Sequence, residues 1–148
     1  NYFEKICAEP LIEINTEKGK IKIELLPNDA PFTSISIAKL IDKKYFDGLC
    51  FHRVVSNFVI QGGDPEGTGM GGPGYNIRTE TSPLKFGTGF VGMASAGRDT
   101  EGSQFFITHS PQPHLDGKYT IFGKVVDGMD TVNKIQEGDK IISIKRIK

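Results

Sequence analysis

Three polar residues, His52, Arg53 and Gln61, interrupt an otherwise apolar segment that reads FHRVVSNFVIQ. A guanidinium placed among phenylalanines and valines is costly to bury unless it is paired or used. We therefore expect Arg53 to have either a partner or a chemical task. We interpret His52 as a structural residue with a satisfied hydrogen bond, because the other two histidines, His109 and His114, are separated by two prolines and do not complete a metal-ligand pattern.

Alternation along two further segments places more polar groups beside apolar ones. In SQFFIT, Gln104 and Phe106 share one face of a strand while Phe105 points to the other. In FVIQ, Val59 and Gln61 likewise share a face. If these faces meet outside a barrel, they form an apolar pocket floor with hydrogen-bonding walls. The same pattern is equally typical of core aromatics with glutamines that anchor loops, and it does not decide between the two.

Two other motifs point to chemistry that their context excludes. Residues 67–72, GTGMGG, have the glycine spacing of a nucleotide-binding loop, but prolines lie on both sides and no helix begins there. The glycines from Gly62 to Gly74 instead predict a surface loop with positive-φ positions that runs close to another segment. Ser103 has neither a nucleophile elbow nor a His/Asp pairing. We expect no cofactor and no metal.

The elements that must position these residues are mostly strands. Alternation predicts a hairpin over residues 11–16 and 20–25 with a turn at Lys18-Gly19. Residues 29–48 predict one amphipathic helix, with Pro31 in its first turn and a stop near Asp47-Gly48. A small helix is expected over residues 129–136. Further short strands are expected over 51–55, 58–63, 89–94, 103–109, 119–126 and 140–148.

Composition bounds the class of protein. The 148 residues are 37% hydrophobic, which suits one globular domain with a real core. Lysine and arginine total 18, as do aspartate and glutamate, so no net field attracts nucleic acid or an anionic membrane. We expect a soluble monomer with neither partner. Many short strands with two helices in one domain predict a mainly β fold, a closed antiparallel barrel with its ends covered by helices.

The cysteines and the first ten residues carry little further information. Cys50 lies in an apolar stretch and is expected to be a buried structural thiol, and with Cys7 it makes no disulfide framework. Residues 1–10 are interpreted as a linker or extension before the domain at 11–148. They lack the charged head and apolar stretch of a signal peptide.

Four long motifs in register resemble one family. The segments FHRVVSNFVIQGGDPEGTGMGGPG, GFVGMASAG, GSQFFITHS and LDGKYTIFGKVVDGMD look like the cyclophilin peptidyl-prolyl isomerases, in the order and spacing of that family. The compact glycine loop is similar to that of bacterial-like or minimal members. The resemblance implies a closed eight-stranded antiparallel β-barrel with two capping helices, and isomerase activity on X-Pro bonds of peptides and unfolded proteins.

The resemblance also implies a role for each matching residue. Arg53 corresponds to the catalytic arginine, Gln61 to the glutamine that holds it, and His52 to a framework histidine. Ala94, Ser95 and Gln104 match the groove for residues that precede the proline. The remaining positions match the proline pocket and its rim: Phe58, Val59, Phe106, His114, Leu115 and Tyr119.

The sequence departs from the family pattern at the pocket rim. Where many cyclophilins carry tryptophan before the L-D-G motif, this chain has His114, and where many carry histidine after G-K it has Tyr119. In the family that tryptophan packs on cyclosporin, so the departure predicts weakened binding of this macrocycle with isomerisation retained. The alternative function is a proline-peptide binding module whose turnover is incidental.

Overall fold

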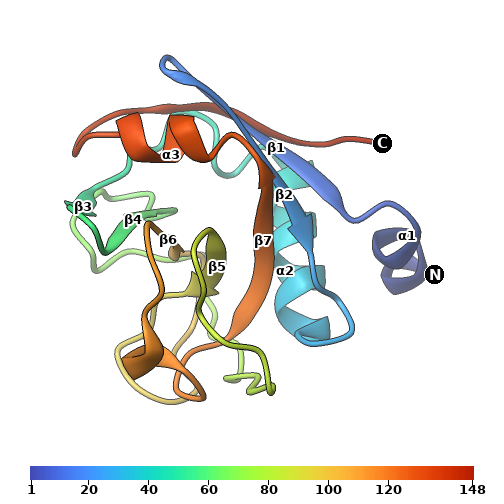
Figure 1. The fold of residues 1–148 in the computed structure, drawn as a ribbon. Coiled ribbons are helices and arrows are strands. Elements are labelled where there is room, and N and C mark those ends of the chain that lie inside the picture. The colour runs from blue at the N-terminus through green and yellow to red at the C-terminus, as the bar shows by residue number, and fades with distance from the viewer.

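The computed structural model describes all 148 residues, and most of them surround one curled antiparallel sheet (Figure 1). The opening hairpin forms because isoleucines alternate with polar residues, so that Ile14 and Ile21 lie opposite each other and both are buried. In chain order the elements are α1 (Tyr2–Ala8), β1 (Leu11–Thr16), β2 (Gly19–Leu25), α2 (Pro31–Asp42), β3 (Arg53–Val55), β4 (Val59–Gly62), β5 (Phe90–Met93), β6 (Phe105–Thr108), the 3-10 helix η1 (Pro113–Leu115), β7 (Ile121–Asp127), α3 (Met129–Lys134) and β8 (Ile141–Arg146).

The eight strands follow the order β3-β4-β6-β5-β7-β2-β1-β8, and every pair is antiparallel. The expected eight-stranded fold is therefore confirmed, but a fully closed barrel is not formed. β3 has only three residues and does not pair with β8. Instead, the irregular segments before them, residues 48–51 and 138–141, exchange backbone hydrogen bonds of 2.7 to 2.9 Å. The sheet is a curled half-barrel joined loosely at this seam.

The helices differ in extent from the sequence prediction. α2 begins at Pro31 as expected but ends at Asp42, short of the predicted stop near Gly48. Lys44 takes a positive φ of 59°, and its N–H bonds to the carbonyl of Ile41 while that of Tyr45 bonds to Leu40. These two bonds close the helix as a Schellman motif. α3 likewise ends at Lys134, because Ile135 is extended.

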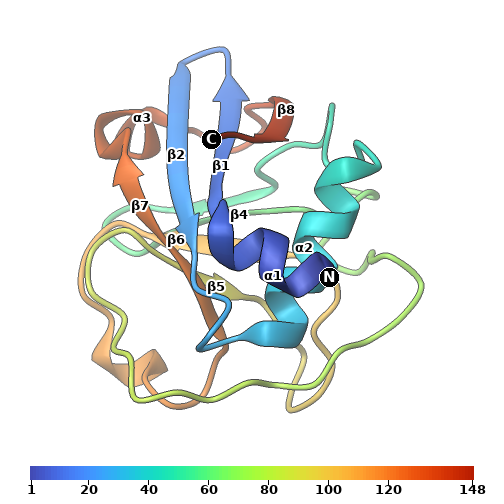
Figure 2. The same ribbon diagram turned by 90° about the vertical axis from the view of Figure 1, so that its right-hand side faces the viewer.

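A third helix, α1, lies in the segment predicted as a linker or extension. It packs beside α2, close to both ends of the chain (Figure 2). Ile6 of α1 is fully buried in the main core. The longest helix, α2, has 12 residues, and none of the helices has the length and apolar character needed to cross a membrane.

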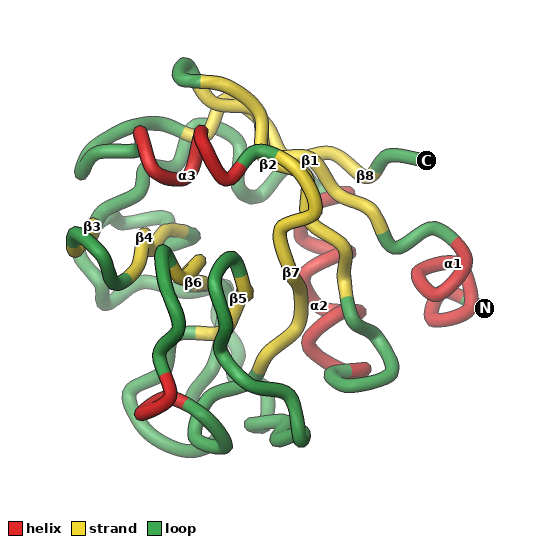
Figure 3. The backbone as a smooth tube through the Cα atoms, viewed as in Figure 1, coloured by secondary structure: helices red, strands yellow, loops and turns green.

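Two apolar clusters lie on opposite faces of the sheet. The large one fills the half-barrel and includes Ile60 and Phe105. The small one, of five buried residues, includes Val59 and Phe106. The predicted alternation at these strands is therefore confirmed. Long loops, rather than strands, make up most of the chain at the lower end of the molecule as drawn in Figure 3.

Candidate active site

The site is built on a row of residues that face one another across four neighbouring strands. Arg53 on β3 lies opposite Gln61 on β4, which lies opposite Phe106 on β6, which in turn lies opposite Gly92 on β5. Side chains opposite each other in a sheet point to the same face. Strand register thus brings a guanidinium, an amide and a phenyl ring together from three separate segments.

Gly92 completes this row by having no side chain. A Cβ atom at this position would lie 2.6 Å from Cζ of Phe106 and 2.8 Å from the ring of Phe86. The two rings stack with their centroids 5.4 Å apart. Glycine at residue 92 therefore lets the Phe106 ring lie down on the sheet and form the floor of a pocket.

The pocket above this floor has a volume of about 280 Å³. Apolar side chains line most of it, and Arg53 is the charged residue at its rim. The residues that line it are Arg53, Phe58, Val59, Gln61, Ala94, Ser95, Phe106, Leu115 and Tyr119. The size and lining suit a small apolar ring presented beside a polar backbone.

Arg53 is exposed, although phenylalanines and valines flank it in the sequence. β3 is an edge strand, and its outward face carries the side chain into solvent. The guanidinium donates a long hydrogen bond of 3.4 Å from its Nη1 to Oε1 of Gln61 and lies 5.8 Å from the centre of the Phe58 ring. These weak contacts hold the arginine over the pocket and leave most of its donors free.

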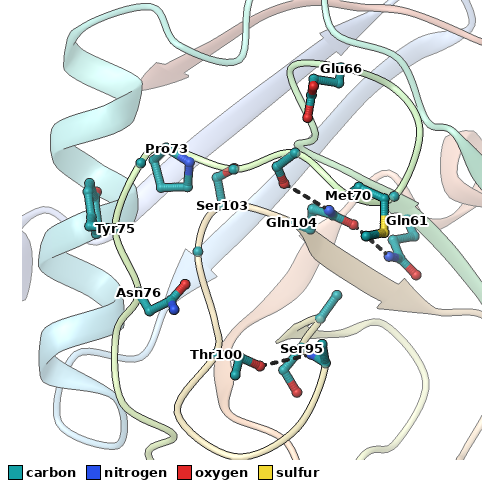
Figure 4. A pocket seen from close by; sticks show the side chains of 17 residues that line it. Gln61, Glu66, Met70, Pro73, Tyr75, Asn76, Ser95, Thr100, Ser103 and Gln104 are labelled. Atoms are coloured by element: carbon teal, nitrogen blue, oxygen red, sulfur yellow. Dashed lines mark hydrogen bonds between the residues drawn. The ribbon is translucent and has the colours of Figure 1, made fainter.

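Gln61 also begins a chain of amides that leads away from the pocket. Its Nε2 donates to Oε1 of Gln104 at 3.1 Å, and Nε2 of Gln104 donates to the carbonyl of Gly71 at 3.0 Å (Figure 4). The chain fixes the orientation of both amide groups, since turning either one would oppose like groups. Arg53 is thereby linked to the glycine-rich loop.

A second cavity, of about 530 Å³, lies beyond Gln104 (Figure 4). The glycine-rich segment 69–76 forms one wall, and residues 94–96, Thr100 and 102–104 form the other. The second cavity shares Gln61, Ala94 and Ser95 with the first pocket. The two cavities are therefore neighbours that meet at these three residues.

The glycine-rich loop that borders the second cavity has the predicted backbone. Gly63, Gly67, Gly69 and Gly74 all have positive φ. At Gly63 the loop passes so close to the next segment that a Cβ atom would clash with the carbonyl oxygen of Ser103. These glycines are needed for conformation and close approach, as expected.

Asp64 holds this loop in shape. Its buried carboxylate accepts backbone N–H groups from Glu66, Thr68 and Gly69. Burial by itself raises the pKa of a carboxyl, but at Asp64 the backbone donors outweigh burial and hold the pKa below its usual value. The carboxylate thus stays charged and satisfied in the interior of the loop.

Three predicted site residues, Gln104, His114 and His52, do not line the first pocket. Gln104 lines the second cavity. His114 on η1 is exposed and does not line the first pocket, but its ring packs 5.7 Å from that of Phe58. At His52 both ring nitrogens are buried, and neither makes a hydrogen bond to another group of the protein.

The sequence analysis missed Phe86 and was wrong about the burial of Cys50. Phe86, which stacks under Phe106, lies in a loop without periodicity, so the sequence carried no signal for it. Its N–H is held by Oδ1 of Asp116 at 2.7 Å. Cys50 is only partly buried, because it lies in the irregular seam of the half-barrel rather than in a strand, and the prediction of a buried thiol is wrong.

Comparison with known proteins places the chain beside one group. A family model described as "Cyclophilin type peptidyl-prolyl cis-trans isomerase/CLD" matches residues 11–147. A peptidyl-prolyl cis-trans isomerase of Synechococcus elongatus is 48% identical over 134 residues, which cover 89% of this chain and 92% of the relative. Peptidyl-prolyl cis-trans isomerase B of Bacillus subtilis is 49% identical over 129 residues, covering 86% and 90%.

Solved structures give the same result. The crystal structure of a Cryptosporidium parvum cyclophilin type peptidyl-prolyl cis-trans isomerase superposes with a TM-score of 0.90 at 35% identity, covering 95% of this chain and 98% of that one. A second structure of that protein, in the presence of the dipeptide Ala-Pro, superposes with a TM-score of 0.88 and covers 93% and 99%.

Proposed function

The chain belongs to the cyclophilin-type peptidyl-prolyl cis-trans isomerase family, and on that premise we propose that its 280 Å³ pocket holds the substrate proline while Arg53 catalyses rotation of the preceding bond. The observation that carries this proposal is the row Arg53–Gln61–Phe106, which places free guanidinium donors beside an apolar pocket. The remaining lining residues, Phe58, Val59, Leu115 and Tyr119, would grip the ring.

The reaction turns one amide bond. An X-Pro bond isomerises slowly because twisting it sacrifices C–N resonance, with a barrier of about 18–20 kcal/mol. At the twisted transition state the proline nitrogen becomes pyramidal and regains a lone pair. A guanidinium N–H that donates to this lone pair binds the transition state more strongly than the planar ground state, as catalysis requires.

The free energy needed for catalysis must come from both Arg53 and the apolar pocket. An acceleration of about 10⁵-fold requires about 7 kcal/mol. One charge-assisted hydrogen bond supplies roughly 1.5–3 kcal/mol. The apolar pocket must supply the rest by desolvating the amide and fixing the ring while the preceding carbonyl moves. No proton is transferred in this scheme.

The substrates are proline-containing peptides and unfolded segments, and the finer recognition is part of our proposal. Gln61 would hold Arg53 and contact the substrate backbone. Ala94, Ser95 and Gln104 would line the groove for the residues before proline. We further propose that the protein acts as a monomer. We also propose that it binds cyclosporin weakly, because His114 stands where many family members carry the tryptophan that packs on this ligand and donates its indole N–H to it.

The test compares isomerisation of a short X-Pro peptide by wild type, Arg53→Ala and Arg53→Lys. Removal of the guanidinium should lower kcat/KM at least about tenfold, or about 1.4 kcal/mol, with the fold unchanged because residue 53 is exposed. Lysine should recover little, because it lacks the planar fork that reaches Gln61 and the substrate together. Arg78→Ala, which removes an exposed arginine outside both cavities, is the matched control. Near-normal turnover by Arg53→Ala would remove Arg53 from the mechanism.

A further inference from the structure

The turn between β3 and β4 places Phe58 in the pocket wall, and its shape depends on a segment from elsewhere in the chain. Asn57 has a left-handed φ of 59°, and the N–H of Phe58 bonds to the carbonyl of Val55 at 3.0 Å. The carbonyl of Phe58 in turn accepts the N–H of His109 at 2.8 Å. Phe58 lines the first pocket, so any movement of this turn changes the pocket wall.

The side chain of Gln112 reaches this turn in two ways. Its Nε2 lies 3.3 Å from the carbonyl oxygen of Asn57 and 3.0 Å from Oγ of Ser110. The Ser110 hydroxyl donates to the same carbonyl at 2.9 Å. Since a carboxamide nitrogen carries two N–H donors, Gln112 holds the Asn57 carbonyl directly and also orients the hydroxyl that holds it.

Gln112 can hold the turn in place because its own position is fixed. It is only 9% exposed, and it is flanked by Pro111 and Pro113, whose rings restrict the backbone on both sides. Its N–H donates to the carbonyl of Phe86 at 2.8 Å, and its carbonyl accepts the N–H of Leu115 at 3.0 Å. Phe86 stacks under the ring that forms the pocket floor, and Leu115 lines the pocket. One residue thus joins three parts of the pocket.

We propose that Gln112 is a positioning residue of the isomerase site, and that its carboxamide acts through Phe58. The guanidinium of Arg53 is held separately, because it donates to Gln61 as well as lying over the Phe58 ring. Loss of the carboxamide should therefore loosen the grip on the proline ring and leave the catalytic arginine in place. The inference rests on the proposed function, since it requires the substrate proline in the first pocket.

The test replaces Gln112 by methionine, which has a similar length and no N–H donor. Isomerisation of a short Ala-Pro peptide is followed by NMR exchange over a range of peptide concentrations, which gives kcat and KM separately. A pocket wall contacts the proline ring in the ground state and the transition state alike, so its displacement raises KM and leaves kcat unchanged. One missing methylene in an apolar pocket costs about 10- to 200-fold, and a displaced ring keeps part of its contact, so KM should rise about three- to tenfold.

A second background separates this role from a general effect on folding. Phe58→Leu removes the ring through which Gln112 is proposed to act, so Gln112→Met should change KM less than about twofold in that background. Gln136→Met, the same substitution at an exposed position after α3 that lines neither cavity, should keep the wild-type KM. Thermal unfolding checks that each variant is folded at the assay temperature.

The outcomes for the two proposals are distinct. An unchanged KM in Gln112→Met overturns the inference, as does a fall in kcat alone. A rise in KM that persists without the Phe58 ring, or that Gln136→Met reproduces, also overturns it. In each of these cases turnover by wild type leaves the proposed function intact, whereas absence of turnover by wild type would contradict the proposed function itself.

Discussion

At the scale of single residues, Gln61 connects the two parts of the site, because both its amide oxygen and its amide nitrogen make hydrogen bonds. Its oxygen accepts from Arg53 at 3.4 Å, and its nitrogen donates to Gln104 at 3.1 Å. The first bond is long and the second is shorter, so Gln61 is fixed more firmly by the loop side than by the arginine. The guanidinium keeps some freedom to follow the substrate nitrogen as the amide turns.

Gly92 is the residue whose replacement tests the pocket floor. Alanine there would press its Cβ against Phe106 and Phe86 at 2.6 to 2.9 Å. Overpacking of this kind costs about 1–3 kcal/mol, so Gly92→Ala should lower the melting temperature and raise KM by pushing Phe106 into the pocket. Thermal unfolding and peptide kinetics measure the two effects. Gly72→Ala, where a Cβ meets open space, should leave the melting temperature unchanged. Equal stability of both variants would show that the rings adjust without cost.

His114 tests the proposal on cyclosporin. Its ring is exposed and packs beside that of Phe58, so a larger side chain has room at this position. His114→Trp should tighten cyclosporin binding by about 5- to 150-fold, or about 1–3 kcal/mol, because it adds an apolar wall and an indole donor. Calorimetric titration of both proteins measures the difference. Equal affinities would show that residue 114 does not control this ligand.

At the scale of elements, the loop that begins at Asp64 makes a prediction about pH. The pKa of Asp64 is lowered in the folded state, so its contribution to stability is present above the ordinary carboxyl pKa of about 3.8 and is lost as pH falls through the lowered value. Asp64→Asn should therefore be less stable than wild type at pH 7, and the difference should shrink between about pH 4 and pH 2. Urea unfolding across this range measures it. A constant difference would mean that the carboxylate charge does not hold the loop.

The elements also show how far the sequence could lead. Strands and the start of α2 follow from local periodicity and Pro31, so they could be predicted. The end of α2 depends on Lys44 adopting a positive φ, which lysine rarely signals. The pocket floor at Val59 and Phe106 follows from strand alternation, whereas Phe86 reaches it from an irregular loop. Alternation and resemblance thus predicted the strand-borne part of the site, and tertiary packing supplied the rest.

At the scale of the whole molecule, α1 extends the fold beyond the residues that match the family model. The match begins at residue 11, but Ile6 is fully buried in the main core together with residues of α2 and β8. Tyr2 of α1 also contacts α2 and β8, through its hydroxyl and its ring respectively. Figures 1 and 2 show α1 lying beside α2. We therefore propose that residues 1–10 are an extension that folds with the domain at 11–148.

Tyr2 makes this docking testable at alkaline pH. Its hydroxyl donates to Oδ2 of Asp42 at 2.6 Å, and Arg146 lies both on its ring and 3.7 Å from Asp42. Burial, followed by the bond to Asp42, raises the pKa of Tyr2 to about 12 from the ordinary value of 10.0. A raised pKa means that the stabilisation is complete below pH 10 and is lost as pH rises toward 12. Urea unfolding between pH 8 and pH 11.5 should show a steeper loss of stability for wild type than for Tyr2→Phe, which cannot ionise. Parallel curves would show that the hydroxyl is no more protected in the folded chain than in the unfolded one.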